Sequence, residues 1–181
     1  MGGHWAEADV SMLTSKLLIQ GEAAGQFTPE GHISRAEFAA LLVRALNVPT
    51  GTSEAFTDVN GSEWYAGVVA AAAKAGLISG FEDGSFRPNG SLTREQAAVM
   101  VIRALQLAGQ KPSAQGEGLS RFTSDGSEIS PFAQQAVADA VNTGILNGLT
   151  DSAFGPQDTT TRAEAAVMLK RLLQVIGFIQ S

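Results

Sequence analysis

The sequence predicts an all-α protein, in which three helix-loop-helix repeats surround a central three-helix bundle with pseudo-threefold symmetry. Two observations support this fold class. One pattern recurs in register along the whole chain, and each copy ends in a segment that is apolar nearly all round, as in a helix buried on most sides. One copy alone could not cover such a helix, so the three are expected to pack together. An open solenoid is the competing arrangement, but only three units and unequal linkers make it less favourable.

Arginines at the start of the apolar segments give the repeat spacing. Arg94 lies 59 residues after Arg35, and Arg162 lies 68 residues after Arg94. The longer spacing contains a polar, glycine-rich stretch at 109–118. We therefore expect modules at 1–50, 51–110 and 111–181 that together form one compact domain. Further landmarks keep the same register: Gly21, Gly80 and Gly148; Phe27, Phe86 and Phe154; Pro29, Pro88 and Pro156; and Arg44, Arg103 and Arg171.

The middle copy shows the elements of one repeat most clearly. A first helix is expected over 64–75, because this stretch is rich in alanine, and Gly76 is placed to end it in a left-handed cap. Residues 77–92 are dense in Gly, Asp, Asn and Pro, which indicates tight turns. The second helix is expected over 94–108, where "TREQ" matches a capping box. The capping pairs in register are Ser34 with Glu37, Thr93 with Gln96 and Thr161 with Glu164.

Composition excludes several classes of function. The net charge of −6, with only 12 Lys and Arg spread along the chain, argues against a nucleic-acid-binding surface. The absence of cysteine excludes disulfides, thiolate chemistry and Cys-based zinc sites. No stretch reaches the roughly 18 apolar residues that a membrane span needs. We therefore expect a globular protein with no metal and no cofactor, and without membrane insertion.

Three arginines occupy an electrostatically unfavourable position. Arg35, Arg94 and Arg162 fall in the first turn of their helices, where the helix dipole disfavours a cation. The backbone N–H groups of a helix start can hold an anion, and a guanidinium beside them can grip a carboxylate with two hydrogen bonds. These arginines are therefore candidate ligand-binding residues. The alternative is that each pairs with a nearby carboxylate or folds back over a turn. The later arginines in register fit a structural role at the helix end.

Glycines, aromatic residues and aspartates recur near these arginines and are further candidates for ligand contact. The glycines could supply a positive φ in a turn, or a bare backbone that a ligand can approach. The aromatic rings could cover the apolar face of a sugar, or anchor the first helix in the core. The aspartates could accept hydrogen bonds from hydroxyl groups, or stabilise a turn. The candidates are Gly21, Gly80 and Gly148; Trp5, Trp64 and Phe132; and Asp83 and Asp151.

Four short motifs, taken together, point to a known family. The middle copy has "FTDV" at 56–59, Trp64 five residues beyond it, "GLISG" at 76–80 and "FRP" at 86–88, and the third copy has "TRAE" at 161–164. "TRAE" alone would be weak evidence, because it is also a good capping box. The combination, present three times over nearly the whole chain, resembles the S-layer homology (SLH) domain.

The resemblance implies a non-catalytic anchor that is secreted and held at the cell wall or S-layer. SLH modules usually occur in threes and attach S-layer proteins or exoenzymes to Gram-positive-type walls. Their usual ligand is a secondary cell wall polymer with pyruvylated N-acetylmannosamine, bound in grooves between modules. By this resemblance, the family's ligand-binding arginine corresponds to Arg35, Arg94 and Arg162. Its motif glycine corresponds to Gly21, Gly80 and Gly148. The isolated anchor is expected to be monomeric and attached to a larger S-layer or surface protein.

The mechanism that we expect is recognition without chemistry. The pyruvyl carboxylate would sit at the start of a second helix, held by an arginine and by backbone N–H groups, while aromatic residues cover the sugar ring. The grooves are expected to differ. The first copy has Leu17 and Ala24 where the others have glycine and aspartate, and the third has Phe132 in place of tryptophan. The second copy is the most complete.

Two other classes of function stay open at this point. The chain could be a helical-repeat module for protein–protein association that binds no glycan. It could also be a glycosidase using carboxylates such as Glu37, Glu95 and Glu164. A glycosidase needs a paired acid and base in one cleft. These glutamates lie in capping or first-turn positions, which disfavours the enzyme.

Overall fold

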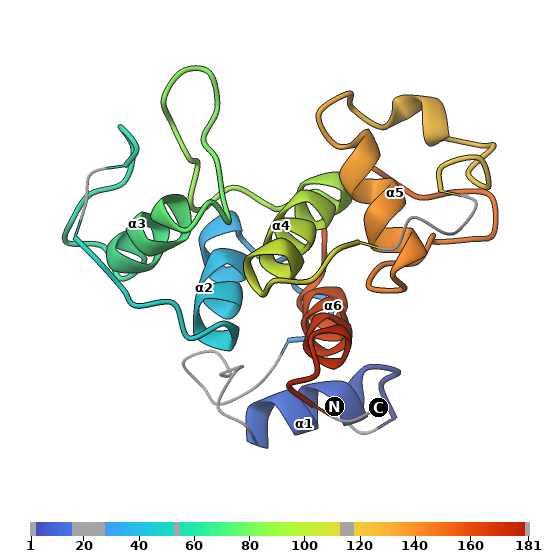
Figure 1. Ribbon diagram of the computed structural model, residues 1–181, viewed down its shortest axis with the longest axis horizontal. Helices are drawn as coiled ribbons and strands as arrows, with labels where there is room; N and C mark the ends of the chain where they lie inside the picture. The colour runs from blue at the N-terminus through green and yellow to red at the C-terminus, as the bar shows by residue number, and fades with distance from the viewer. Residues whose placement is uncertain (1–2, 16–27, 53–54, 113–117, 180–181) are drawn as a thin grey trace.

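The computed structural model describes residues 3–15, 28–52, 55–112 and 118–179. Over these ranges the chain forms helices joined by turns and isolated β-bridges, without a named strand, so the all-α prediction is confirmed. Figure 1 shows the arrangement. The elements are α1 (Glu7–Ser15), α2 (Arg35–Ala45), α3 (Ala66–Lys74), α4 (Arg94–Leu107), the 3-10 helix η1 (Gly126–Glu128), α5 (Gln134–Asn142) and α6 (Arg162–Val175).

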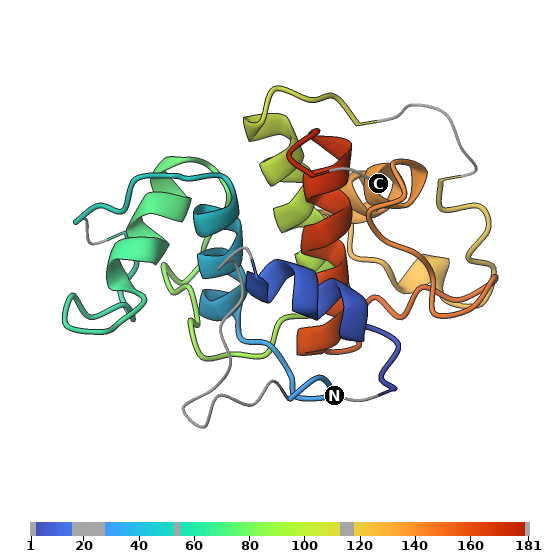
Figure 2. The same cartoon turned by 90° about the horizontal axis from the view of Figure 1, so that it is seen from below.

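The second helices of the three repeats form the centre of the molecule. Each of α2, α4 and α6 contacts the other two, and the three run roughly side by side in Figure 2. Most of their alanine, leucine, valine and methionine side chains are buried, as expected for helices that are apolar nearly all round. The predicted central three-helix bundle is therefore present.

Capping boxes set the start of each central helix. The side chains of Ser34, Thr93 and Thr161 accept hydrogen bonds from the backbone N–H three residues on, and the residue at that position reaches back to the cap. Two otherwise unpaired backbone donors are satisfied at each helix start. All three predicted boxes are confirmed.

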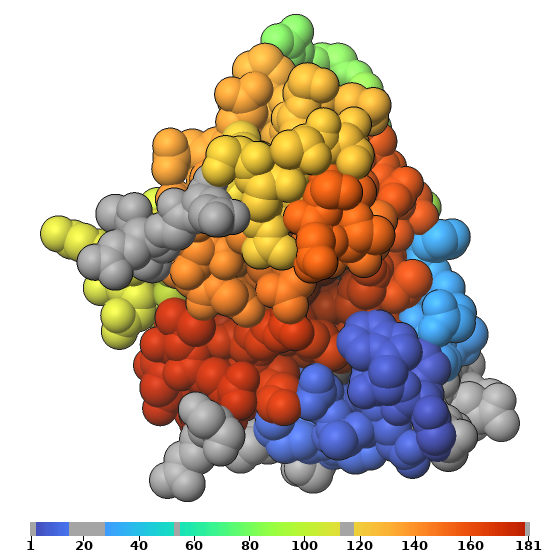
Figure 3. All heavy atoms as spheres, turned by 90° about the vertical axis from the view of Figure 1, so that its right-hand side faces the viewer, coloured from blue at the N-terminus to red at the C-terminus, as the bar shows by residue number. Residues whose placement is uncertain are grey.

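The outer helices pack across repeats. Helix α3 packs against α2, α5 against α4, and α1 against α6, so each first helix covers the central helix of the preceding repeat. Figure 3 shows the atoms of α1 lying against those of α6. An ion pair joins them, with Lys170 Nζ 2.6 Å from Asp9 Oδ1. The first and last helices therefore close a ring, which rules out the open solenoid. The module boundaries at 1–50, 51–110 and 111–181 stay a prediction.

The ends of the outer helices confirm one expectation and correct another. Gly76 and Gly144 both have a φ of +74°, so they end α3 and α5 in the left-handed conformation that favours glycine. The expected start of the first helix at Trp64 is wrong, because residues 60–66 form two tight turns and α3 begins only at Ala66. The turns are closed by hydrogen bonds from Glu63 N to Asn60 O and from Ala66 N to Glu63 O.

The core contains the phenylalanines that are in register in the second and third repeats. Phe86 and Phe154 are fully buried, each within the turn-rich loop that joins an outer helix to a central helix. The corresponding residue of the first repeat, Phe27, lies outside the described residues, as do Leu17, Gly21 and Ala24. No helix over the described ranges is long and apolar enough to cross a lipid bilayer.

Replacing Leu13 with alanine tests the closure of the ring. Leu13 is fully buried on α1, so Leu13→Ala should lower the free energy of unfolding by about 2–5 kcal/mol through lost burial and the remaining cavity. Urea denaturation measures this change. Thr14→Ala, at an exposed position on the same helix, should change it by at most about 0.5 kcal/mol. Equal effects of the two substitutions would contradict a sealing role for α1.

Candidate functional site

Each repeat's first-turn arginine reaches into the following repeat. Arg35 Nε donates to Phe86 O at 2.7 Å, and Arg94 Nε donates to the matching Phe154 O at 2.9 Å. The Nη2 atoms donate to loop carbonyls that are also in register, Ser79 O at 3.4 Å and Asn147 O at 2.8 Å. A buried guanidinium requires such partners. The arginines therefore fasten the loop of the next repeat to the central bundle.

Each of the three arginines also contacts the capping residue of the next repeat. Arg94 Nη1 lies 2.9 Å from Glu164 Oε1, and Arg162 Nη1 lies 2.9 Å from Glu37 Oε1. Arg35 Nη1 instead donates to the amide oxygen of Gln96 at 3.0 Å. The links run from the first repeat to the second, from the second to the third, and back to the first. The pairing with carboxylates weighed as an alternative thus occurs at two of these arginines.

The backbone N–H groups at the helix starts are already paired. Arg35 N donates to Gly90 O at 3.0 Å and Ala36 N to Pro88 O at 2.9 Å. The same pairs of bonds recur at α4 and α6, to carbonyls of the third and first repeats. The expectation that these N–H groups would hold the ligand anion is therefore wrong, because the proline-containing loop of the following repeat supplies carbonyl oxygens to them.

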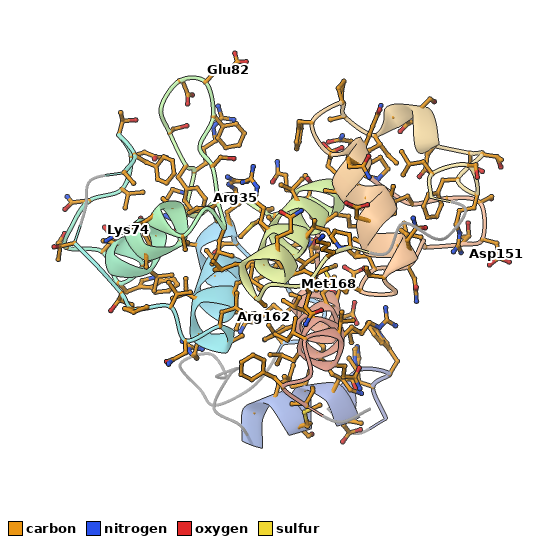
Figure 4. The ribbon with its side chains drawn as sticks, viewed as in Figure 1. Arg35, Lys74, Glu82, Asp151, Arg162 and Met168 are labelled. Atoms are coloured by element: carbon orange, nitrogen blue, oxygen red, sulfur yellow. The ribbon has the colours of Figure 1, made fainter. Side chains whose placement is uncertain are left out.

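A groove of about 690 Å³ lies beside Arg35, where all three repeats meet. The first repeat contributes Arg35, the third contributes Phe132, and the second contributes the remaining wall. Figure 4 shows Arg35 at the start of α2 and Glu82 on the loop that rises beside it. The residues that line the groove are Arg35, Ile78, Ser79, Gly80, Phe81, Glu82, Asp83, Arg87, Gln96, Val99, Met100, Arg103 and Phe132.

The groove brings together part of the predicted site. Arg35, Gly80, Asp83 and Phe132 all line it. The other candidates do not line this groove, and Gly21 lies outside the described residues. Those elsewhere in the structure are Arg94, Arg162, Gly148, Trp5, Trp64 and Asp151.

The three aromatic residues in register are exposed. Trp5, Trp64 and Phe132 expose 64%, 62% and 65% of their surface, respectively. Exposed aromatic residues at one repeated position do not serve as anchors in a core. The anchoring alternative is therefore wrong, and the Phe132 ring is available to a molecule in the groove.

The motif glycines are required by close packing. Neither Gly80 nor Gly148 has a positive φ, so the first of the two alternatives, a left-handed turn at these glycines, is wrong. A Cβ atom on Gly80 would lie 2.6 Å from both the Phe56 ring and Ser85 O. On Gly148 it would lie 2.5 Å from Thr150 O and 2.6 Å from the Phe122 ring. These positions thus admit only glycine, because a neighbouring ring and the loop backbone pass directly over them.

Asp83 stabilises a turn. Its Oδ1 accepts hydrogen bonds from Ser85 N at 2.9 Å and Ser85 Oγ at 2.6 Å, and its Oδ2 lies 3.1 Å from Arg87 Nη2. The hydrogen bonds from Ser85, followed by that from Arg87, lower the pKa of Asp83 to about 2. Asp151 is exposed, and the residues in register with Ser85 and Arg87 are Ala153 and Gly155. The two aspartates therefore differ in environment.

Positive charge dominates the wall nearest Arg35. The Arg35 guanidinium lies 4.8 Å from the centre of the Phe81 ring, and that of Arg87 lies 3.9 Å from it. The pKa of Arg35 is lowered to about 10, first by burial and then by the positive charge of Arg87, while Asp58 acts in the opposite direction. Arg35 is thus a charged group at neutral pH that would be further stabilised by an anion.

Sequence reasoning missed four residues around this groove. Phe81 and Arg87 occur only in the second repeat and gave no repeated signal. Arg103 does recur, but it was assigned to the helix end, whereas its Nη1 donates to Ser79 Oγ at 3.0 Å in the groove wall. Asp58 of "FTDV" accepts hydrogen bonds from Phe86 N and Arg87 N at 2.8 and 2.7 Å and so shapes the loop. Its place in the "FTDV" motif at 56–59 was the signal that could have identified it.

The glutamates considered for catalysis all have structural partners. Glu37 and Glu164 complete capping boxes and receive arginines. Glu95 is buried and accepts hydrogen bonds from Ser130 and Gln157. Over the part of the chain that the structure describes, no group of three or more His, Cys, Asp or Glu side chains is arranged to hold a metal ion.

Comparison with known proteins agrees with this architecture. The model of the S-layer homology domain matches residues 1–39, 55–98 and 123–166. An amylopullulanase of Thermoanaerobacterium thermosulfurigenes is 38% identical over 97% of this chain and 9% of its own length. The surface-layer 125 kDa protein of Lysinibacillus sphaericus is 34% identical over 94% of this chain and 14% of its own. The S-layer protein of Bacillus thuringiensis subsp. finitimus is 30% identical over 96% of this chain and 21% of its own. The chain belongs to the S-layer homology domain family.

Proposed function

We propose that this chain is a non-catalytic anchor that holds a larger protein at the bacterial cell wall by binding an anionic wall polysaccharide. The ligand that fits the groove at Arg35 best is a pyruvylated N-acetylmannosamine residue of a secondary cell wall polymer. The observation that carries the proposal is the convergence of a buried guanidinium and an exposed aromatic ring, from different repeats, in one groove.

The relatives support anchoring over catalysis. They include an amylopullulanase and an exoglucanase as well as surface-layer proteins and a "middle cell wall protein". The chain spans 9% and 16% of the two enzymes, and 14% of each of the latter two. A segment shared by proteins with unrelated names is expected to supply location instead of a reaction. We accordingly propose a secreted, wall-attached parent protein, and a monomeric anchor within it.

The hydrogen-bonding capacity of Arg35 supports a carboxylate ligand. A guanidinium has five N–H donors, and the three bonds to described residues use three of them. The two donors that have no partner among the described residues can serve an oxygen of a ligand in the groove. A pyruvyl ketal places a carboxylate at a fixed position on a sugar ring, so it could bind there without losing much conformational freedom.

The shape and lining of the groove support a sugar. Its volume of about 690 Å³ lies within the range of small-ligand sites, about 300–1,000 Å³. Phe132 offers a flat apolar surface for the C–H face of the ring, and Glu82 and Asp83 offer oxygen atoms to hydroxyl groups. Binding at more than one of the three related positions on a repeating polymer would add avidity.

Calorimetry with matched saccharides tests the proposed ligand. The pyruvylated monosaccharide should bind measurably, because its carboxylate can meet Arg35. The same saccharide without pyruvate should bind at least about 10-fold more weakly, since a charge-assisted hydrogen bond contributes about 1.5–3 kcal/mol. Equal affinities would contradict the carboxylate mechanism.

Replacing Arg35 tests its role directly. Arg35→Gln should weaken binding of the pyruvylated saccharide at this groove about 10- to 150-fold, by the same energies. Lys74→Gln removes an equal charge from an exposed position on α3 outside the groove, and should leave the affinity unchanged. Circular dichroism establishes that both variants are folded. Full retention of wall attachment by Arg35→Gln would favour a protein-association module.

The pH dependence of binding follows from the lowered pKa of Arg35. Its guanidinium is protonated below about pH 10 and loses its charge above it. Affinity for the pyruvylated saccharide should therefore be level through the neutral range and fall above about pH 10. Calorimetry at several pH values, with circular dichroism to verify folding, measures this. The unpyruvylated saccharide serves as the control, and a similar fall with it would argue against Arg35 as the cause.

A further inference from the structure

The third residue of each central helix is a glutamate in the first and third repeats but a glutamine in the second. Glu37, Gln96 and Glu164 are in register, and each receives the arginine of the preceding repeat. Arg94 and Arg162 meet a carboxylate there, whereas Arg35 meets a neutral amide. The middle repeat therefore carries one negative charge fewer at the position that faces the ligand arginine.

Two of the three side-chain hydrogen bonds of Arg35 are longer than those of Arg94, so its guanidinium is less tightly bound by the protein. The side-chain hydrogen bonds of Arg94 measure 2.9, 2.9 and 2.8 Å, whereas those of Arg35 measure 2.7, 3.0 and 3.4 Å. A carboxylate paired with a guanidinium makes a shorter and stronger bond than an amide does. An incoming anion must compete with the Glu164 carboxylate for Arg94. At Arg35 the described residues supply only carbonyl and amide oxygens, so an anion would be the first charged partner in direct contact with this guanidinium.

The charges around the groove also favour anion binding at Arg35 over Arg94. The charged residues that line the Arg35 groove are Arg35, Arg87, Arg103, Glu82 and Asp83, which leaves one positive charge in excess. Asp58 also lies close by and its negative charge acts on Arg35, but it does not distinguish the two positions, because Asp125 accepts the equivalent backbone N–H groups of the third repeat and acts on Arg94 in the same way. Around Arg94, the charged residues in register are Arg171, Glu164 and Asp151, so the positive and negative charges balance once Arg94 itself is counted. The positions that match Phe81, Glu82 and Arg87 are the uncharged Leu149, Thr150 and Gly155.

The backbone conformation of Arg87 supports a role in ligand binding for its positively charged side chain. Arg87 has a φ of +58°, a conformation that residues other than glycine adopt rarely, and the residue in register is Gly155 with a φ of +69°. An arginine therefore occupies a position where the loop geometry favours glycine. Strain of this kind points to a function that offsets it.

From these observations we propose that Gln96 makes the groove at Arg35 the principal anion-binding site of this chain, and that Glu164 and Glu37 weaken the equivalent positions at Arg94 and Arg162. This inference rests on the proposed function, because the anion is taken to be the carboxylate of the wall glycan. It assigns unequal affinities to three positions that share one scaffold.

The substitution Gln96→Glu separates this effect from damage to the fold. Glutamate already completes the same capping box in the other two repeats, and a negative charge in the first turn is favoured by the helix dipole. The variant should therefore unfold at the same temperature as the unmodified chain or at a higher one. Its affinity for the pyruvylated saccharide should nevertheless fall at least about 10-fold. A stability gain together with an affinity loss is not what misfolding would produce.

Two further variants complete the experiment, with calorimetry on the pyruvylated monosaccharide as the readout. Gln106→Glu adds the same charge at an exposed position of α4 outside the groove, and should leave the affinity unchanged. Glu164→Gln removes the carboxylate that faces Arg94, and should strengthen binding at that position at least about 10-fold, which adds a second site to the titration.

The outcomes distinguish this inference from the proposed function. If the unmodified chain binds the pyruvylated saccharide but Gln96→Glu binds it equally well, the inference is wrong and the proposed function stands. Equal losses in Gln96→Glu and Gln106→Glu would also overturn the inference, since the effect would then be one of overall charge. If the unmodified chain does not bind the pyruvylated saccharide at all, both the proposed function and the inference fail.

Discussion

The structure depends on the hydrogen bonds by which one repeat's arginine holds the loop of the next. Because a buried guanidinium must be surrounded by acceptors, Arg35 and Arg94 draw the carbonyls of Phe86 and Phe154 and the capping residues Gln96 and Glu164 toward the central bundle. Arg162 contacts the first repeat in the same sense through Glu37. The three links run in one direction around the bundle, and the packing of α1 on α6 completes the ring.

The same links explain how a cation is tolerated at a helix start. The backbone N–H groups that give a helix its positive end are satisfied at each central helix by carbonyls of the neighbouring repeat. The guanidinium then extends away from its own helix into a cluster of carbonyl and carboxylate or amide oxygens. The arginine is therefore first a structural residue, and a ligand can use only the donors left over. This shared use couples glycan recognition to the assembly of the three repeats.

One scaffold, used three times, need not give three equal sites. Backbone contacts and capping boxes are repeated closely, while side chains at the groove vary. The groove at Arg35 combines an amide at Gln96, a second arginine at 87 and an aromatic ring at 132. Substitutions at these few exposed or half-buried positions can alter charge and shape without disturbing the core, because the core is built from other residues.

The sequence by itself determined the helical repeats, the capping boxes, the span of the central helices and the family, because these features depend on local hydrogen bonding and on apolar periodicity. It also brought Arg35, Gly80, Asp83 and Phe132 into the candidate set. Only the tertiary structure decided that each first-turn arginine donates hydrogen bonds to the next repeat. It also showed that Gly80 must be glycine because the Phe56 ring lies directly against it, and that the N–H groups at the helix starts are already paired. Residues in register can make equivalent contacts within a repeat or between repeats. The choice between these depends on long-range packing, which no local pattern in the sequence encodes.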